Sequence, residues 1–413
     1  MVEIDTNYLE QQFIDSCRYN TRSDAQSQTI PSTPGQIDLA KRVVTDLKKL
    51  GLKAWYNEKN GYALGYVPGN CDKEISAVGF FAHLDTADYP ADNVSPQVHP
   101  DYDGRDVILN EEKQIILRVA EFPELKDLAG QRLITTDGTT LLGADDKAGV
   151  AALLAAVQSL VTQPEIKHGP LYVAFGPDEE IGQGAKRFDE TEFPVEFAYT
   201  LDNGQPGDLE YETFNAAAAT VEIEGTAVHP GDAYHLMVNA SSLAHELVAG
   251  LPLAEVPEKS RGRQGFIMVT RQESTPDHAH LELIIRDFDQ QLFANKKKLL
   301  KDLAQQINDR YDQERVKIEI KEQYSNIGEE IKKNPAIVKL ALKAYDTLGL
   351  KPNIVPFRGG TDGNFLTEKG IPTPNLFNAG HNFHGKYEYV TVEGMQTVAQ
   401  TIIEISRTHA NTK

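Results

Sequence analysis

Apolar runs alternate with amphipathic helical patterns over the first two hundred residues. Residues 36–50 carry apolar side chains at a period near 3.6, which predicts a helix, and residues 146–161 form a second, alanine-rich one. Residues 75–82, 171–175 and 197–201 are short, nearly continuous apolar runs, as expected of strands buried on both faces. Strands separated by helices predict an α/β fold, with a mainly parallel sheet and helices on both of its faces.

One long stretch shows no such pattern. Residues 86–130 are rich in Asp, Pro and Asn, and we expect an irregular loop there. Loops of that length inside a domain are uncommon and often functional.

The pattern changes near residue 215. The order of elements expected from there is strand 218–224, helix 239–249, strand 265–272, strand 280–287, helix 290–311 and strand 316–323. This βαββαβ order predicts a ferredoxin-like module. Because a helix at 335–348 and a strand at 375–377 resume the first pattern, we expect one domain of residues 1–214 and 326–413 that carries residues 215–325 as an insert.

Composition narrows the classes of partner and ligand. The 413 residues carry 61 acids against 41 bases, and a formal charge of −20 argues against nucleic acid as a partner. With only two cysteines, any metal site must use nitrogen and oxygen ligands. No apolar stretch approaches the ~20 residues of a membrane span. No signal-peptide pattern is visible at the start, so we expect a cytoplasmic protein that does not enter a membrane.

Candidate ligands follow four of the apolar runs. The set comprises His83, Asp85, Asp145, Asp146, Glu179, Glu180 and Asp202, with a histidine near the C-terminus, His381 or His384. In open parallel sheets, sites form at the carboxyl ends of strands. Histidines and carboxylates gathered there predict a two-metal hydrolytic centre.

Each of these residues has a simpler interpretation when it is taken alone. Asp145 and Asp146 can serve as dipole partners at a helix start, and Asp202 can serve as a turn former. Glu179 and Glu180 are neighbours on an extended segment and should point in opposite directions, so one can bind metal while the other acts as a base. The set as a whole is harder to explain by solubility, whereas nothing local separates His381 from His384.

Basic side chains in three other places can bind substrate. Arg358 opens a glycine-rich turn, 358–363, where a fixed guanidinium suits a carboxylate. His229, in a turn of the insert, and Arg286, at a strand end, are more often structural. The chain has no HExxH helix, P-loop or GxSxG elbow.

Taken in order, these segments resemble the dizinc aminopeptidase and carboxypeptidase family that includes peptidase T, the tripeptide aminopeptidase. The matching segments are His83-Leu84-Asp85-Thr86, Thr136-Asp137-Gly138, Gly143-Ala144-Asp145-Asp146-Lys147-Ala148-Gly149, Gly176-Pro177-Asp178-Glu179-Glu180-Ile181-Gly182, Asp202-Asn203-Gly204, Arg358-Gly359-Gly360-Thr361-Asp362-Gly363 and Gly380-His381-Asn382-Phe383-His384-Gly385. They run in family order over nearly the whole chain.

The resemblance implies a role for each matched residue. Asp145 would bridge two Zn²⁺ ions per subunit, for which Co²⁺ or Mn²⁺ can substitute. His83 and Asp202 would bind one ion, and Glu180 and His384 the other. Asp85 would orient His83, and Glu179 would be the general base. The resemblance thus selects His384 over His381, which the residues themselves do not.

The resemblance also implies a substrate and an assembly. Residues 215–325 would form a lid through which a homodimer assembles, and His229 would help to hold the scissile carbonyl from its own chain or its partner's. Arg358, Arg286 and Asn239 would hold the carboxyl end of short peptides, most of all tripeptides, in peptide catabolism. The alternatives are a related dipeptidase, carboxypeptidase or N-acyl-amino-acid deacylase, or a non-catalytic metal-binding protein. Side-chain preference and the metal used in the cell stay open.

Overall fold

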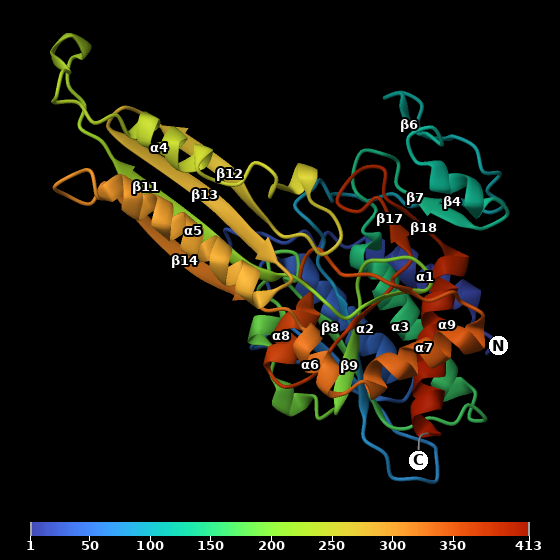
Figure 1. Ribbon diagram of the computed structural model, residues 1–413. Helices are drawn as coiled ribbons and strands as arrows, with labels where there is room; N and C mark the ends of the chain where they lie inside the picture. The colour runs from blue at the N-terminus through green and yellow to red at the C-terminus, as the bar shows by residue number, and fades with distance from the viewer. Residues whose placement is uncertain (1, 412–413) are drawn as a thin grey trace. The chain divides into compact units, whose positions relative to one another are not determined.

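The computed structural model describes residues 2–411 and consists of two compact units (Figure 1). The first comprises Met1–Tyr211, Glu329–Val355 and Thr361–Lys413, and the second comprises Glu212–Gly328 and Pro356–Gly360. The second unit therefore extends beyond the insert expected from the sequence, 215–325, by residues 212–214, 326–328 and 356–360.

An eight-stranded sheet forms the centre of the first unit. Its strands lie in the order β1 (Lys53–Tyr56), β2 (Ala63–Val67), β8 (Leu171–Gly176), β3 (Val78–His83), β9 (Phe197–Leu201), β16 (Asn375–Leu376), β10 (Asp208–Glu210) and β15 (Asn353–Ile354). Strands β8, β3, β9 and β16 are parallel, whereas β1, β2 and β10 add antiparallel pairs toward the edges. The parallel core expected from the continuous apolar runs is confirmed.

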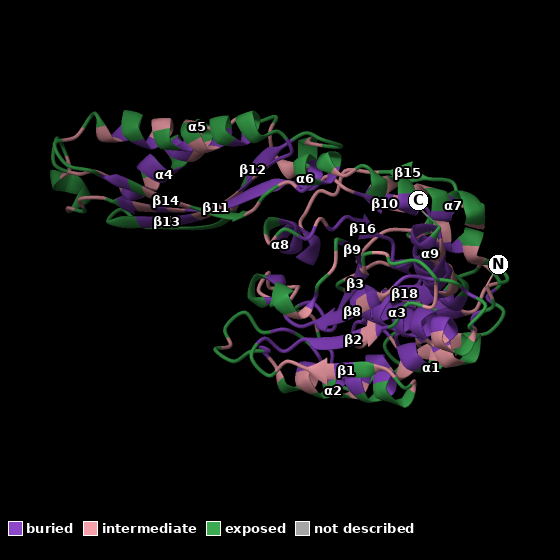
Figure 2. Ribbon diagram, turned by 90° about the horizontal axis from the view of Figure 1, so that it is seen from below, coloured by how far each residue is buried: buried purple, intermediate pink, exposed green. Residues whose placement is uncertain are grey.

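Successive side chains of β3 show that both faces of this sheet are covered. Phe80 belongs to the core shared with the long helices, whereas Phe81 packs against the rings of Phe188 and Phe193 on the opposite face. Figure 2 shows α3 and α9 on one side of the strands and α8 on the other. The helices of this unit are α1 (Thr6–Cys17), α2 (Pro34–Lys49), α3 (Ala144–Thr162), α7 (Ala336–Leu348), α8 (Asp362–Glu368) and α9 (Val392–Ala410), and α6 (Gly328–Lys333) begins at the boundary between the units.

The expectation of an irregular loop over residues 86–130 is wrong. The stretch contains β4 (Gln97–His99), the hairpin β5 (Val107–Asn110) and β6 (Ile115–Leu117), and the 3-10 helix η1 (Pro123–Leu128). Strand β4 pairs with β7 (Leu133–Thr135), which pairs in turn with β18 (Tyr389–Thr391) and through it with β17 (Gly380–His381). Leu117, Leu125 and Tyr389 share a small core there. Strands β17 and β18, which complete the sheet of β4 and β7, are far away in sequence, so local periodicity could not reveal that sheet.

The second unit has the ferredoxin-like arrangement expected from the sequence. Its elements are β11 (Asn215–Glu224), α4 (Ala240–Ala249), β12 (Phe266–Ser274), β13 (His278–Asp287), α5 (Gln290–Asn308) and β14 (Val316–Tyr324). The sheet order is β12-β13-β11-β14 with every pair antiparallel, which confirms the predicted fold. Leu247 of α4 and Leu300 of α5 are buried with Leu281 of the sheet.

Four further 3-10 helices complete the described elements: η2 (Ala185–Arg187), η3 (Glu190–Glu192), η4 (Pro230–Asp232) and η5 (Pro257–Lys259). Within residues 2–411, every helix is too short or too polar to cross a membrane.

Candidate metal centre

The ends of three parallel strands bring the candidate residues to one edge of the central sheet. His83 is the last residue of β3 and lies opposite Gly176, the last residue of β8. Asp202 directly follows β9, on the other side of β3. Because these strands run parallel, their carboxyl ends meet, and the turn that carries Glu179 and Glu180 starts at the same edge.

Asp145 reaches this edge from the start of α3. The backbone of Asp145 (φ −84°, ψ 106°) and of Asp146 (φ −116°, ψ 33°) is not helical, so both residues belong to an irregular first turn. Asp145 accepts contacts on both carboxylate oxygens: His83 Nε2 lies 2.9 Å from Oδ1, and His384 Nε2 lies 2.9 Å from Oδ2. A single carboxylate thus connects two imidazoles that come from different parts of the chain.

Two sets of candidate ligand atoms share this carboxylate. One consists of His83, Asp145 and Asp202, and the other of Asp145, Glu180 and His384; within each set the ligand atoms lie within 4.8 Å of one another. Each set has one imidazole and two carboxylates, which is a donor set for divalent metal ions. The five residues that the sequence suggested as ligands therefore lie together, and their arrangement can hold two ions.

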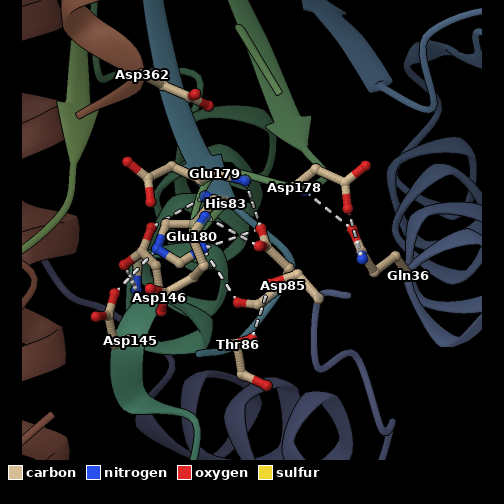
Figure 3. Close-up of polar contacts among 12 residues, drawn as sticks. Gln36, His83, Asp85, Thr86, Asp145, Asp146, Asp178, Glu179, Glu180 and Asp362 are labelled. Carbon is tan, nitrogen blue, oxygen red and sulfur yellow. Dashed lines mark hydrogen bonds and ion pairs between the residues drawn. The ribbon is translucent and has the colours of Figure 1, made fainter. Parts of the chain in front are cut away.

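Asp85 contacts both the imidazole of His83 and the turn that carries Glu179 and Glu180 (Figure 3). Its backbone oxygen lies 3.1 Å and its Oδ1 3.4 Å from Nδ1 of His83. Its two carboxylate oxygens accept the backbone N–H groups of Glu179 (3.0 Å) and Glu180 (3.1 Å). Asp85 therefore orients His83 with Nε2 toward Asp145, and it also fixes the segment that carries both glutamates.

The centre carries more buried negative charge than its histidines balance. Desolvation, and then the Asp202 carboxylate, raise the pKa of Glu179 well above its usual value. Desolvation, followed by Asp145, does the same to the pKa of Asp202. The nearby carboxylates of Asp145 and Glu180 raise the pKa of His384 to about 10. The same carboxylates that favour a proton on the imidazole would favour a cation in each set, and metal binding would displace protons from the ligands.

Glu180 shows most directly that the donor set suits a cation. Its Oε1 is buried and accepts no hydrogen bond, although His384 Nε2 lies 3.2 Å away. A buried carboxylate oxygen without a hydrogen bond is costly. A metal ion between Glu180, Asp145 and His384 would satisfy that oxygen.

The two C-terminal histidines occupy different environments. His384 lies in the second set with its side chain 54% exposed, whereas His381 stacks on the ring of Tyr389 with 4.5 Å between centroids. Burial lowers the pKa of His381 to about 4. His381 thus has the environment of a packing residue.

Several further buried polar residues surround the centre. The sequence made Asp146 a candidate ligand, but it belongs to neither ligand set, and the others were given no role from the sequence. Asp146 accepts hydrogen bonds from His83 N, Gly149 N and Asn378 Nδ2. Asp178 accepts the backbone N–H of Ser32 and an amide N–H of Gln36. Asp362 accepts the backbone N–H of Ala185 and the hydroxyl O–H of Tyr62. Asn375 donates to the backbone oxygen of Asp202, and Glu388 contacts the segment before α3. In the sequence, each of these residues is simply an acid or an amide close to a matched segment. Such residues are so frequent on protein surfaces that the sequence alone could not identify these.

The four candidate substrate-binding residues all belong to the second unit. Arg358 donates to the backbone oxygens of Gly262 and Gln264 and to Ser260 Oγ. Arg286 donates to two backbone oxygens, those of Ala217 and Ile285. Asn239 caps α4, and His229 is a largely exposed residue in a turn. Their contact with substrate stays a prediction.

Comparisons with known proteins agree with one another. Residues 136–408 match Peptidase family M20/M25/M40. The chain is 47% identical to Peptidase T of Fusobacterium nucleatum over 402 residues, covering 97% of this chain and 98% of that protein. It is 44% identical to Peptidase T of Bacillus subtilis over 398 residues, covering 96% and 97%. The crystal structure of aminopeptidase PepT from Bacillus cereus superposes with a TM-score of 0.79 at 21% identity, covering 99% of this chain and 100% of that one.

Proposed function

The chain belongs to peptidase family M20/M25/M40, and we propose that it is a metal-dependent aminopeptidase that removes the N-terminal residue from short peptides, above all tripeptides. The observation that carries this proposal is the shared carboxylate of Asp145, which joins two ligand sets beside Glu179. The similarity to Peptidase T over nearly the full length supports the substrate class.

We further propose that the two ions are Zn²⁺. Asp145 would contribute to both sites, His83 and Asp202 would hold one ion, and Glu180 and His384 would hold the other. Imidazole and carboxylate ligands suit zinc, although they also suit Co²⁺ and Mn²⁺. When bound, a pair of such ions polarises the peptide carbonyl and lowers the pKa of water from 15.7 toward ~7.

Glu179 is the residue best placed to move the proton. Its backbone is fixed by Asp85, and it is not a member of either ligand set. In the proposed reaction, Glu179 accepts a proton from water as the water oxygen bonds to the scissile carbonyl carbon. It then donates that proton to the leaving nitrogen as the C–N bond breaks, which yields an amino acid and a shortened peptide.

The second unit supplies the proposed contacts to the rest of the substrate. We propose that Arg358, Arg286 and Asn239 bind the peptide carboxyl end and that His229 holds the scissile carbonyl. The exposed position of His229 leaves its imidazole accessible to a ligand. Arg358 and Arg286 already donate hydrogen bonds to backbone oxygens. Only their remaining N–H groups are available to bind substrate.

The proposed assembly is a homodimer formed through the second unit. The implied role of this unit as a lid supports the proposal, and light scattering on the full chain tests it. A monomeric mass at micromolar concentration would contradict it. The cytoplasmic location expected from the sequence stays a prediction.

A substrate panel tests the activity. Tripeptides with a free amino terminus should be cleaved faster than dipeptides or N-acylated amino acids, and chelation should stop the cleavage. Cleavage of N-acylated amino acids alone would contradict the aminopeptidase assignment. Metal content by mass spectrometry on the same preparation should give two ions per chain, and one ion or none would contradict the paired centre.

A further inference from the structure

Glu388 is a buried acid that belongs to neither ligand set and contacts the segment leading into Asp145. Its Oε2 accepts the backbone N–H groups of Leu142 (2.8 Å) and Gly143 (2.7 Å), and its Oε1 accepts that of Asp145 (2.9 Å). The residue is 1% exposed. Three charge-assisted hydrogen bonds to one short segment are a strong constraint on its backbone.

The start of α3 has no side-chain cap of its own. Gly143 occupies the N-cap position of α3 with φ +88° and has no side chain to cap the helix. Asp145 and Asp146 depart from helical geometry, so the helix itself does not set the direction of Asp145. Glu388 supplies from a distant part of the chain the carboxylate that a capping residue would otherwise provide, at the end of the helix where negative charge is favourable.

The loop that carries Glu388 also carries a candidate metal ligand, His384. His384 and Glu388 both lie between β17 and β18, four residues apart. His384 contacts Oδ2 of Asp145, while Glu388 binds the backbone N–H of the same aspartate. The loop therefore holds Asp145 at its main chain and at its carboxylate.

We propose that Glu388 is a positioning residue of the metal centre, which fixes the main chain of Asp145 so that the carboxylate faces both ligand sets. This inference rests on the proposed function in one respect, the bridging role of Asp145. It predicts that metal affinity depends on Glu388 although Glu388 touches no ion.

The test replaces the carboxylate by an amide. Glu388→Gln has one acceptor oxygen, and its NH₂ group would face backbone N–H donors. We expect the affinity of the folded protein for Zn²⁺ to fall about 10- to 100-fold, the usual effect of losing a group that orients a ligand. The affinity is measured by competition with a chromophoric chelator at a temperature far below unfolding, and the absorption spectrum of the Co²⁺-loaded protein should change as well.

Glu404→Gln is the matched control. Glu404 is 5% exposed, lies on α9 and pairs with Arg407, away from the ligand sets. A merely structural role of Glu388 would lower the melting temperature of the metal-free protein and leave metal affinity and the Co²⁺ spectrum as in the control. That result would overturn the proposal.

If the glutamine variant does not fold, Glu388→Asp provides a second test of metal affinity. Its shorter side chain keeps the charge but cannot reach all three N–H groups, so an intermediate loss of affinity is expected and wild-type affinity would contradict the proposal. Because metal binding is measured without peptide, failure of the wild type to cleave tripeptides would contradict the proposed function and leave this test intact.

Discussion

Two clusters of histidines and carboxylates, one in each unit, use the same chemistry in different surroundings. In the first unit, Asp145 lies 2.9 Å from the nearest nitrogens of both His83 and His384. On the sheet of the second unit, Glu222 lies 2.9 Å from His278 Nε2 and 2.7 Å from His280 Nδ1. Contact distances alone do not distinguish the two clusters.

Geometry and charge balance do distinguish them. Among the described residues, only the sets that share Asp145 bring three ligand atoms together. Hydrogen bonds from His280 lower the pKa of Glu222, whereas desolvation raises the pKa values of Glu179 and Asp202. The convergence of ligand atoms and the burial of the acids, and not residue type, distinguish the first cluster from the second.

The sharpest test of this contrast is removal of the metal. Dialysis against a strong chelator should reduce tripeptide cleavage to background, and two equivalents of Zn²⁺ per chain should restore it, because the ions supply the polarisation that the side chains lack. The rate is followed by release of the N-terminal amino acid. Full activity in a preparation shown to be metal-free would contradict the proposed centre.

Loss of the proposed base should have the next largest effect. Glu179→Ala should bind two ions but cleave tripeptides about 10²- to 10⁴-fold more slowly, because no other group is assigned to accept the proton. Rate and metal content are measured on the same sample. Glu282→Ala, which removes an acid from the second cluster, serves as the control and should keep its activity. A wild-type rate in Glu179→Ala would refute the assigned base.

The two C-terminal histidines offer a matched pair. His384→Ala removes an imidazole from one ligand set, so bound zinc should fall from two ions per chain toward one. His381→Ala removes a ring stacked on Tyr389 and should retain both ions. Mass spectrometry under native conditions counts the ions. Equal metal content in the two variants would show that His384 is not a ligand.

The smallest effect is expected in the second cluster, where it should depend on pH. Hydrogen bonds with Glu222 and Glu282 raise the pKa of His280, so the protonated pair stabilises the folded state below the ordinary pKa of histidine. That stability is lost as the pH rises through the raised value. Because the groups are partly exposed and solvent screens them, Glu222→Gln should cost at most ~1 kcal/mol near pH 6 and less at pH 9. Urea denaturation at both pH values measures this, and a larger cost at pH 9 would contradict the argument.

The sequence predicted most of the fold because its signals are local. The apolar runs that form β3, β8 and β9 are continuous, and the order of elements in the second unit was readable from periodicity. The small sheet around β4 and β7 escaped prediction because its other strands, β17 and β18, lie some 250 residues further along the chain.

For the candidate centre, the sequence by itself determined which residue types stand at the ends of apolar runs, and hence which acids and histidines were candidates. Only the tertiary structure decided that Asp145 contacts both His83 and His384, that Asp85 holds the glutamate turn, and that Glu388 holds the start of α3. Such contacts join segments up to about 240 residues apart, and each exists only because the sheet and the C-terminal loop fold around one edge. The spacing of these residues along the chain does not predict that they converge, because their convergence arises from the packing of the whole domain.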